Sequence, residues 1–175
     1  YDNQVLGFAL PAMIAEWHAA RSLFSPVLAI GLVGVGVGAG LGGLVGDRIG
    51  RKAALIGSAV LFALATGAVA WVHDISPLLI LRLLAGIGIG GVFPNAAALA
   101  AEFSPQRNRP MAVALTIVCV PLGGMIGGLI AAMVLPALGW RALFVLGGTA
   151  PLALAAVLLW TLPESPRFMA RRPER

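Results

Sequence analysis

Two charged residues stand inside long apolar stretches of this sequence, where an isolated charge is costly. Asp2 precedes Glu16 by 14 residues, about 21 Å of helix, which places Asp2 deep in the first stretch. Arg82 lies five residues after Pro77, inside another stretch. An unpaired charge at a bilayer centre costs roughly 2.5 to 3.5 kcal/mol, so such residues face a protein interior or a water-filled cavity. We interpret Asp2 as a carboxylate that titrates protons and Arg82 as a guanidinium that binds an anionic group, because its planar fork matches a carboxylate.

A purely structural role competes with this interpretation. An interhelical ion pair, or an arginine that extends toward the membrane interface, would also place charges at these positions. Other chemistry is scarce in the sequence. His18 and His73 are too few to hold a metal, and Cys119 lies in an apolar run, so neither a metal cluster nor a disulfide framework is expected. Because no nucleophile–base pair is visible, we expect neither an enzyme nor a cofactor.

The composition indicates which elements position these charges. Apolar residues make up 59% of the sequence and charged residues only 11%, whereas soluble domains carry about 25% charged residues. A helix needs about 20 apolar residues to cross the hydrocarbon core of a bilayer. Apolar runs separated by polar residues predict an all-α integral membrane bundle of six helices, over residues 1–15 (truncated), 23–45, 53–72, 77–101, 111–135 and 142–162, followed by a basic tail over 163–175.

The basic residues predict the orientation of this bundle. Nine Lys and Arg residues fall in the loops 46–53 and 102–110 and in the tail, against two on the other side, Arg21 and Arg141. Because cytoplasmic loops carry the excess of Lys and Arg, we expect these loops and the tail 163–175 to be cytoplasmic. The basic residues lie between apolar runs rather than on one continuous polar face, so nucleic acid is not expected as a partner.

A weak internal repeat divides the spans into three and three. Spans one and four each carry an internal charge and a later proline, Pro11 or Pro94, and spans two and five are rich in glycine. This pattern favours two inverted three-helix repeats, with a substrate site near the midplane between them. Glycines such as Gly34, Gly38 and Gly124 lie inside apolar spans, so we interpret them as helix-packing positions rather than as a nucleotide-binding loop.

The segment between the second and third spans, Gly43-Leu44-Val45-Gly46-Asp47-Arg48-Ile49-Gly50-Arg51-Lys52, has the most specific pattern. Asp47 stands at a helix end, where it can accept a hydrogen bond from Arg51. The segment resembles the cytoplasmic loop signature of the major facilitator superfamily, G-x-x-x-D-R-x-G-R-[RK]. The resemblance implies that this loop locks and releases the cytoplasmic gate, with Gly43, Asp47, Arg48, Gly50 and Arg51 as the gate-loop residues.

Further motifs follow in the family's order. Residues 82–90 resemble its R-x-x-x-G-x-G-x-G helix, 102–109 its E-x-x-P-x-x-x-R loop and 163–167 its P-E-S-x-R sequence. The opening Tyr1-Asp2 with Gly7 and Pro11, the run 90–96 and the phrase Gly139-Trp140-Arg141 resemble the aromatic acid:proton symporters, which carry 4-hydroxybenzoate, benzoate and related acids into bacteria. This resemblance implies functional charges at Asp2, Asp47, Arg82 and Glu102, and we assign Asp2, Arg82 and Glu102 to substrate binding and proton coupling.

The sequence therefore predicts a secondary transporter of the bacterial inner membrane, which takes up an aromatic carboxylate with protons by alternating access. Its partners would be a small organic anion, protons, the lipid bilayer and a missing C-terminal six-helix half. One alternative is another porter of the superfamily, for a sugar or a dicarboxylate, since sugar porters share the motifs at Glu102 and Pro163. Another is a non-transporting membrane sensor or anchor domain. A homodimer is the alternative to a truncated chain.

Overall fold

A computed structural model describes residues 2–165, with side chains from residue 4 onward. The side chain of Asp2 and the tail residues 166–175 therefore lie outside the described part. Every regular element of the described chain is helical. The long helices are α1 (Asp2–Trp17), α2 (Ser25–Ile49), α3 (Arg51–Ala68), α4 (Ile75–Phe103) and α5 (Arg109–Thr161), and the short 3-10 turns are η1 (Arg21–Phe24), η2 (Val69–Trp71) and η3 (Gln106–Asn108).

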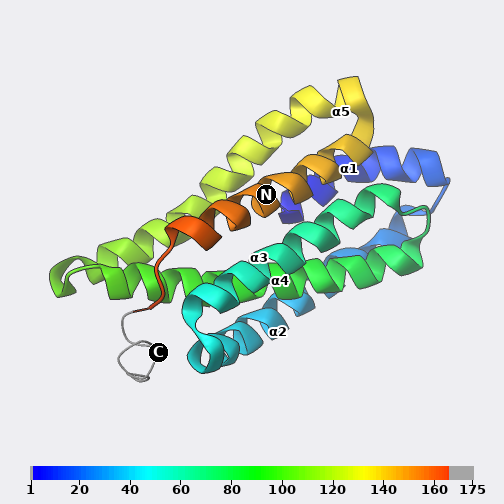
Figure 1. Cartoon of the computed structure of the whole chain (residues 1–175). Coiled ribbons are helices and arrows are strands. Elements are labelled where there is room, and N and C mark those ends of the chain that lie inside the picture. Colours follow the sequence, from blue (N-terminus) through cyan, green and yellow to red (C-terminus); the bar gives the residue numbers. More distant parts are fainter. Residues whose placement is uncertain (1, 166–175) are drawn as a thin grey trace.

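Helix α5 is two antiparallel legs joined at one glycine. Its 53 residues would extend about 80 Å if straight, against about 30 Å of bilayer core. Gly139 interrupts it with φ 76° and ψ 177°, a backbone conformation essentially restricted to glycine, and the chain reverses there (Figure 1). The sequence predicts a loop over 136–141. Instead the first leg (109–138) runs through Pro136, and Trp140 begins the second leg (140–161) directly.

The sequence also predicts a loop over 46–53, and this prediction is wrong. Helix α2 continues to Ile49 and α3 begins at Arg51, so that Gly50 alone joins the two helices. Gly50 has φ 109°, which a residue with a side chain adopts only with strain. At the connection from α4 to α5, α4 extends to Phe103 and therefore includes Glu102. Asp47, Arg51 and Glu102 thus lie on helix ends rather than in flexible loops.

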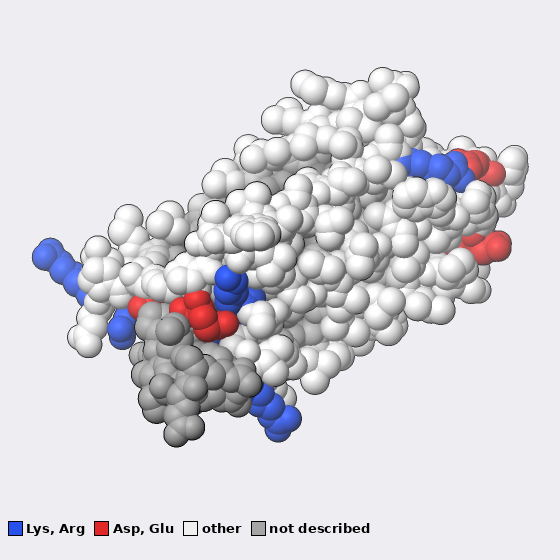
Figure 2. Space-filling view, in the orientation of Figure 1, with Lys and Arg blue, Asp and Glu red and all other residues white. Residues whose placement is uncertain are grey.

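The length and charge distribution of the helices suit a membrane. Four helical segments, which contain α2, α3, α4 and α5, are long and apolar enough to cross one. Helix α1 has 16 residues, and its N-terminal end lies midway along the bundle (Figure 1). On the face in Figure 2 the charged side chains gather at the two ends, with uncharged surface between them. We name these the Arg51 end, where α2 meets α3, and the Trp140 end, where α5 reverses.

Helices α2 and α4 touch backbone to backbone. The buried glycines of α2 recur about one helical turn apart, at Gly31, Gly34, Gly38, Gly42 and Gly46. A Cβ built at Gly34 would lie 2.5 Å from the carbonyl oxygen of Leu83, and one at Gly38 would lie 2.7 Å from the Cα of Ile87. Such close approach is how small residues stabilise helix pairs in lipid, where the hydrophobic effect between helices is lost. The predicted packing role of Gly34 and Gly38 is confirmed.

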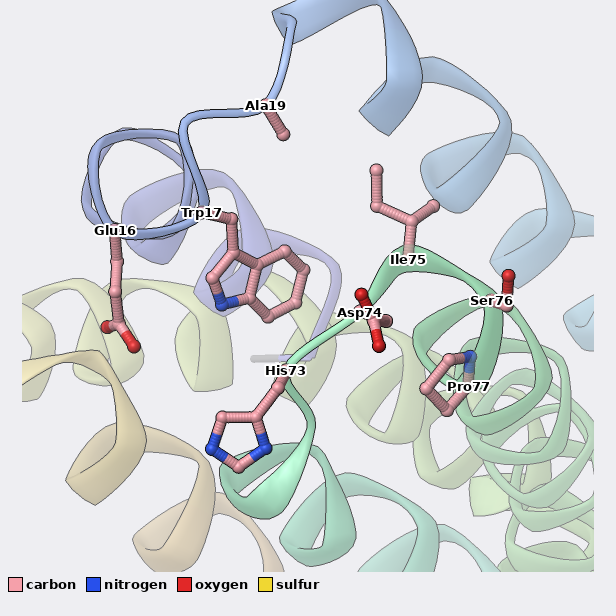
Figure 3. Close-up of a pocket in the computed structure, with 8 residues that line it drawn as sticks. All are labelled: Glu16, Trp17, Ala19, His73, Asp74, Ile75, Ser76 and Pro77. Carbon is pink, nitrogen blue, oxygen red and sulfur yellow. The ribbon is translucent and has the colours of Figure 1, made fainter.

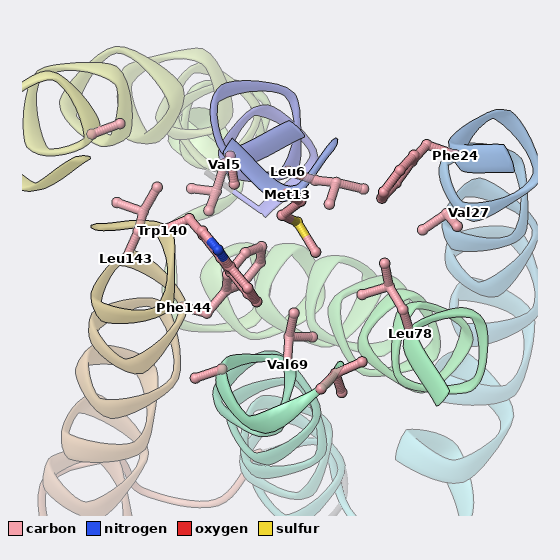
Figure 4. Close-up of a cluster of buried hydrophobic side chains, with 14 residues drawn as sticks. Val5, Leu6, Met13, Phe24, Val27, Val69, Leu78, Trp140, Leu143 and Phe144 are labelled. Carbon is pink, nitrogen blue, oxygen red and sulfur yellow. The ribbon is translucent and has the colours of Figure 1, made fainter. Parts of the chain in front are cut away.

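A buried apolar cluster joins the remaining elements toward the Trp140 end (Figure 4). The fully buried side chains come from α1, η1, α2, η2, α4 and the second leg of α5, and include Met13, Val27, Val69, Leu78 and Phe144. Because six segments meet here, the relative positions of α1, α4 and α5 are fixed by side-chain packing. This cluster surrounds the ring that contacts Arg82.

Replacing Gly38 by alanine is expected to destabilise the full-length protein by about 1–3 kcal/mol, because the new Cβ forces two backbones apart. The melting temperature in detergent measures this loss. Gly57→Ala is the matched control, since Gly57 is exposed on α3 and no described atom lies within 4 Å of a Cβ built there. Equal melting temperatures for the two variants would contradict the close α2–α4 contact.

Candidate functional site

Arg82 is held inside the bundle by α4. It is only 2% exposed, seven residues after the start of the helix at Ile75. Its guanidinium carbon lies 5.3 Å from the ring centroid of Phe144, which is fully buried on the second leg of α5. A cation over an aromatic face is stabilised by the ring quadrupole, most strongly where water is excluded. The predicted interior position of Arg82 is therefore present in the fold.

This arrangement favours recognition of a flat anion. The N–H groups of a guanidinium point outward in its own plane, so a guanidinium over a ring can still donate to the two oxygens of a carboxylate. An arginine at this position can thus bind a carboxylate in the interior of the bundle.

Asp2 opens α1, and its side chain lies outside the described residues. The turn that follows it packs on the first leg of α5, where a Cβ at Gly124 would lie 2.7 Å from the Cδ of Gln4. The N-terminal end of α1 thus faces α5 midway along the bundle (Figure 1). The role of Asp2 stays a prediction.

A second charged group, the Arg51 cluster, joins four segments at the Arg51 end. It comprises Asp47, Arg51, Glu102, Glu164 and Ser165. Arg51 Nη2 donates to Asp47 Oδ1 at 2.8 Å, and its Nε forms an ion pair with Glu102 Oε1 at 3.1 Å. The other oxygen of Glu102 accepts a hydrogen bond from the Ser165 hydroxyl. The side chain of Glu102 is only 6% exposed, so the Arg51–Glu102 pair is less screened by solvent than the Asp47 contact.

Glu164 completes the cluster by capping α3. Its Oε1 accepts the backbone N–H of Lys52 at 3.1 Å and that of Ser165 at 2.9 Å. A carboxylate at a helix N-terminus satisfies N–H groups that lack intrahelical partners and interacts favourably with the helix dipole. A Cβ at Gly50 would lie 2.8 Å from Glu164 Oε2, so a side chain there would displace the capping carboxylate, in addition to straining the positive φ. The chain after α5 is thereby tied to the α2–α3 junction.

The structure separates two residues to which the sequence assigns one role, substrate binding and proton coupling. Arg82 and Glu102 are 20 residues apart along α4, about 30 Å. Glu102 belongs to the Arg51 cluster, and its part in proton coupling stays a prediction. Of the other gate-loop residues, Arg48 is exposed, and Gly43 has no described atom within 4 Å of a built Cβ.

Sequence reasoning assigns no role to Glu164 and Ser165. Both lie in the P-E-S-x-R motif. One sequence feature could have indicated a role for Glu164: it is an acidic residue just after an apolar run, and a carboxylate interacts favourably with a helix N-terminus. The sequence gives no indication that Ser165 contacts Glu102, because 63 residues separate them.

The Trp140 end holds a third polar group around Glu16, which lies beyond the predicted span 1–15. Glu16, Trp17, His73 and Asp74 line an open pocket of about 590 Å³ (Figure 3). A hydrogen bond from Arg141, and to a smaller extent one from Trp140, lowers the pKa of Glu16, so this carboxylate stays ionised at neutral pH. No three His, Cys, Asp or Glu side chains from residue 4 to residue 165 are placed to hold a metal ion.

The comparisons with known proteins agree with this architecture. The sequence model described as Major Facilitator Superfamily matches residues 1–175, the whole chain. The chain belongs to the major facilitator superfamily. Within the superfamily it is 38% identical to the gallate transporter of Pseudomonas putida, 40% identical to the 4-hydroxybenzoate transporter PcaK of that species and 32% identical to the benzoate transport protein of Acinetobacter baylyi.

Each of these alignments covers 98% of this chain but only 38% of the relative. The chain thus spans well under half the length of the superfamily members that it matches. Their names are those of aromatic acid transporters, as the sequence predicts, and not of enzymes.

Solved structures of the superfamily share the fold. The inward-open xylose transporter XylE of E. coli superposes with a TM-score of 0.85 at 25% identity, over 97% of this chain and 46% of that one. XylE bound to 6-bromo-6-deoxy-D-glucose gives a TM-score of 0.83 at 27% identity, over 98% and 43%. The helices described above therefore form a major facilitator fold, over less than half of a full transporter.

A double-mutant cycle tests the Arg51 cluster. Arg51→Ala and Glu102→Ala should each lower the melting temperature of the full-length protein, because each removes one member of the partly buried Arg51–Glu102 ion pair. The double variant should lose less than the sum, by a coupling energy of roughly 0.5–3 kcal/mol. Arg48→Ala combined with Glu102→Ala is the control and should be additive, since Arg48 is exposed. Additivity in the Arg51 cycle would show that the ion pair contributes nothing.

Proposed function

We propose that this chain is the N-terminal half of a transporter that takes up an aromatic carboxylate together with protons, by alternating access, across the bacterial inner membrane. The observation that carries the proposal is Arg82, a guanidinium buried over the Phe144 ring in the interior of the bundle. Relatives at 38–40% identity that are named for gallate and 4-hydroxybenzoate support an aromatic acid as the substrate.

In this proposal Arg82 binds the carboxylate of the substrate. Aligned hydrogen bonds between ionised groups are about twice as strong as neutral ones, and exclusion of water strengthens them further. Asp2 carries the proton, because a carboxylate in the membrane interior is easier to protonate than one in water. The proton:xylose symporter XylE, which shares the fold, supports coupling to protons.

The Arg51 cluster would act as the cytoplasmic gate. Its contacts join α2, α3, α4 and the chain after α5, so they must break or move together when these helices separate. The excess of Lys and Arg at this end supports a cytoplasmic position. We also propose that α1–α3 and α4 with the two legs of α5 are inverted repeats of three spans each, completed by a C-terminal half of six more.

A sugar porter is the alternative with a specific observation in its favour, since the matching solved structures are of a xylose transporter. Sugars carry hydroxyl groups and no carboxylate, so they form no charge-assisted pair with a guanidinium. The relatives named for gallate, 4-hydroxybenzoate and benzoate favour the acid.

Uptake of labelled 4-hydroxybenzoate by cells that express the full-length protein tests the proposal. Arg82→Gln should reduce uptake at least roughly 30-fold, because a carboxylate loses charge-assisted hydrogen bonds worth about 2 kcal/mol or more. Asp2→Asn should abolish the response of uptake to an imposed proton gradient while substrate exchange continues. Arg107→Gln, at an exposed position on η3, is the matched control.

Competition identifies the substrate class in the same assay. Unlabelled benzoate in excess should inhibit uptake, and xylose should not. Wild-type uptake that xylose inhibits and benzoate does not would make the protein a sugar porter. Normal uptake by both Arg82→Gln and Asp2→Asn would show that the site assignment is wrong.

A further inference from the structure

A hydrogen-bonded group at the Trp140 end joins α1 to the second leg of α5. The indole Nε1–H of Trp140 donates to Glu16 Oε2 at 2.7 Å. Arg141 donates through Nη1 to Glu16 Oε2 at 2.9 Å, and its Nη2 forms an ion pair with Oε1 at 2.7 Å. Glu16 thus binds the guanidinium through both oxygens and the indole through one, and none of these contacts belongs to the interior site or to the Arg51 cluster.

The orientation of the Trp140 ring is fixed from several directions. The Glu16 carboxylate accepts from its N–H in the ring plane, and the Arg141 guanidinium lies 4.4 Å from the ring centroid. Trp17 of α1 packs edge to face with it at 5.9 Å and 86°. Trp140 is itself only 4% exposed, and a close-packed ring with these partners cannot turn without losing them.

Trp140 in turn contacts the ring beneath Arg82. One helical turn along α5, Phe144 packs edge to face on Trp140, with centroids 6.0 Å apart and planes at 81°. The Phe144 ring also contacts the Arg82 guanidinium, at 5.3 Å. Figure 4 shows Trp140 and Phe144 side by side in the buried cluster. A continuous series of contacts therefore runs from Glu16 through Trp140 and Phe144 to Arg82.

Gly139 determines where this series begins. Its positive φ reverses the chain, so that Trp140 is the first residue of the second leg. No described atom lies within 4 Å of a Cβ built at Gly139, so the requirement for glycine there is conformational rather than steric. The reversal places the indole beside the last turn of α1.

We propose that Glu16 and Trp140 are positioning residues, which hold the Phe144 ring in the orientation that orients the Arg82 guanidinium for the substrate. The inference rests on the proposed role of Arg82 as the carboxylate-binding residue. Glu16 and Trp140 do not touch the substrate. They act through Phe144, and their loss loosens Arg82 without removing its charge.

The kinetics of the full-length transporter in proteoliposomes test this proposal. Trp140→Phe keeps an aromatic edge but removes the N–H, and Glu16→Ala removes its acceptor. Both are expected to raise KM for 4-hydroxybenzoate about threefold to tenfold, the range that one aromatic contact supports, with kcat nearly unchanged. Phe144→Leu should raise KM by at least as much. Trp71→Phe is the matched control, since Trp71 is 70% exposed.

Glu16→Gln separates positioning from simple tethering of α1 to α5. The amide oxygen still accepts from the Trp140 indole while the charge that pairs with Arg141 is gone. Positioning predicts that Glu16→Gln reverses most of the rise in KM that Glu16→Ala causes. Tethering by the ion pair predicts that Gln and Ala are equally damaging and that protein yield falls instead of affinity, and this result would overturn the proposal.

Measuring Arg82→Gln in the same assay distinguishes failure of the positioning role from failure of the proposed function. A raised KM for Arg82→Gln with an unchanged KM for Trp140→Phe and Phe144→Leu overturns the positioning role and leaves the proposed function intact. An unchanged KM for Arg82→Gln overturns both. In the expected case Trp140→Phe has little further effect in the Arg82→Gln background, because the group that it positions is already missing.

Discussion

Exclusion of water from the hydrocarbon core of a bilayer is the constraint on which this structure depends. Charged groups there cost several kcal/mol unless protein partners replace water. Among the side chains from residue 4 to residue 165, the charged groups lie at the two ends of the bundle, and Arg82 in the interior is the exception. The Phe144 ring is one of the partners that make this exception tolerable. A buried charge kept at such cost suggests a group that the protein uses.

The same constraint explains how the helices pack. Lipid tails are as apolar as leucine, so helices associate through close contact rather than through exclusion of water. The glycines of α2 let its backbone approach α4, and α4 carries Arg82 near one end and Glu102 near the other. Helix α4 is therefore a rigid element shared by the interior site and the Arg51 cluster. A displacement of α4 would therefore be felt at both.

Much of this could be predicted from the sequence. Apolar runs of about 20 residues located the membrane helices, since length and composition alone decide whether a helix can span. Spacing also placed Arg82 in the interior. The position of Asp47 at a helix end, just before Arg51, predicted the contact that these two residues make across Gly50. The helix ends were harder. At Gly50 and Gly139 a single residue stands where the sequence predicts a loop, because a positive φ reverses the chain at one position. The residue type alone does not show which glycines adopt that conformation.

Long-range contacts were the part that sequence could not supply. Glu102 and Ser165 are 63 residues apart, and Glu16 and Trp140 are 124 apart. Such pairs depend on how the helices assemble, and a single sequence carries no periodicity that reports it. Arg82 and Glu102 received one role from the sequence, which could not show that α4 carries their side chains about 30 Å apart, into different sets of contacts.

Equilibrium binding to the purified full-length protein tests the central claim most directly. Calorimetric titration would compare 4-hydroxybenzoate with its uncharged methyl ester, in wild type and in Arg82→Gln. If the buried guanidinium recognises the carboxylate, the acid binds wild type at least about tenfold more tightly than the ester, and the difference disappears in Arg82→Gln. Equal affinity of wild type for the acid and the ester, or a preference for the acid that survives loss of the guanidinium, would contradict the account.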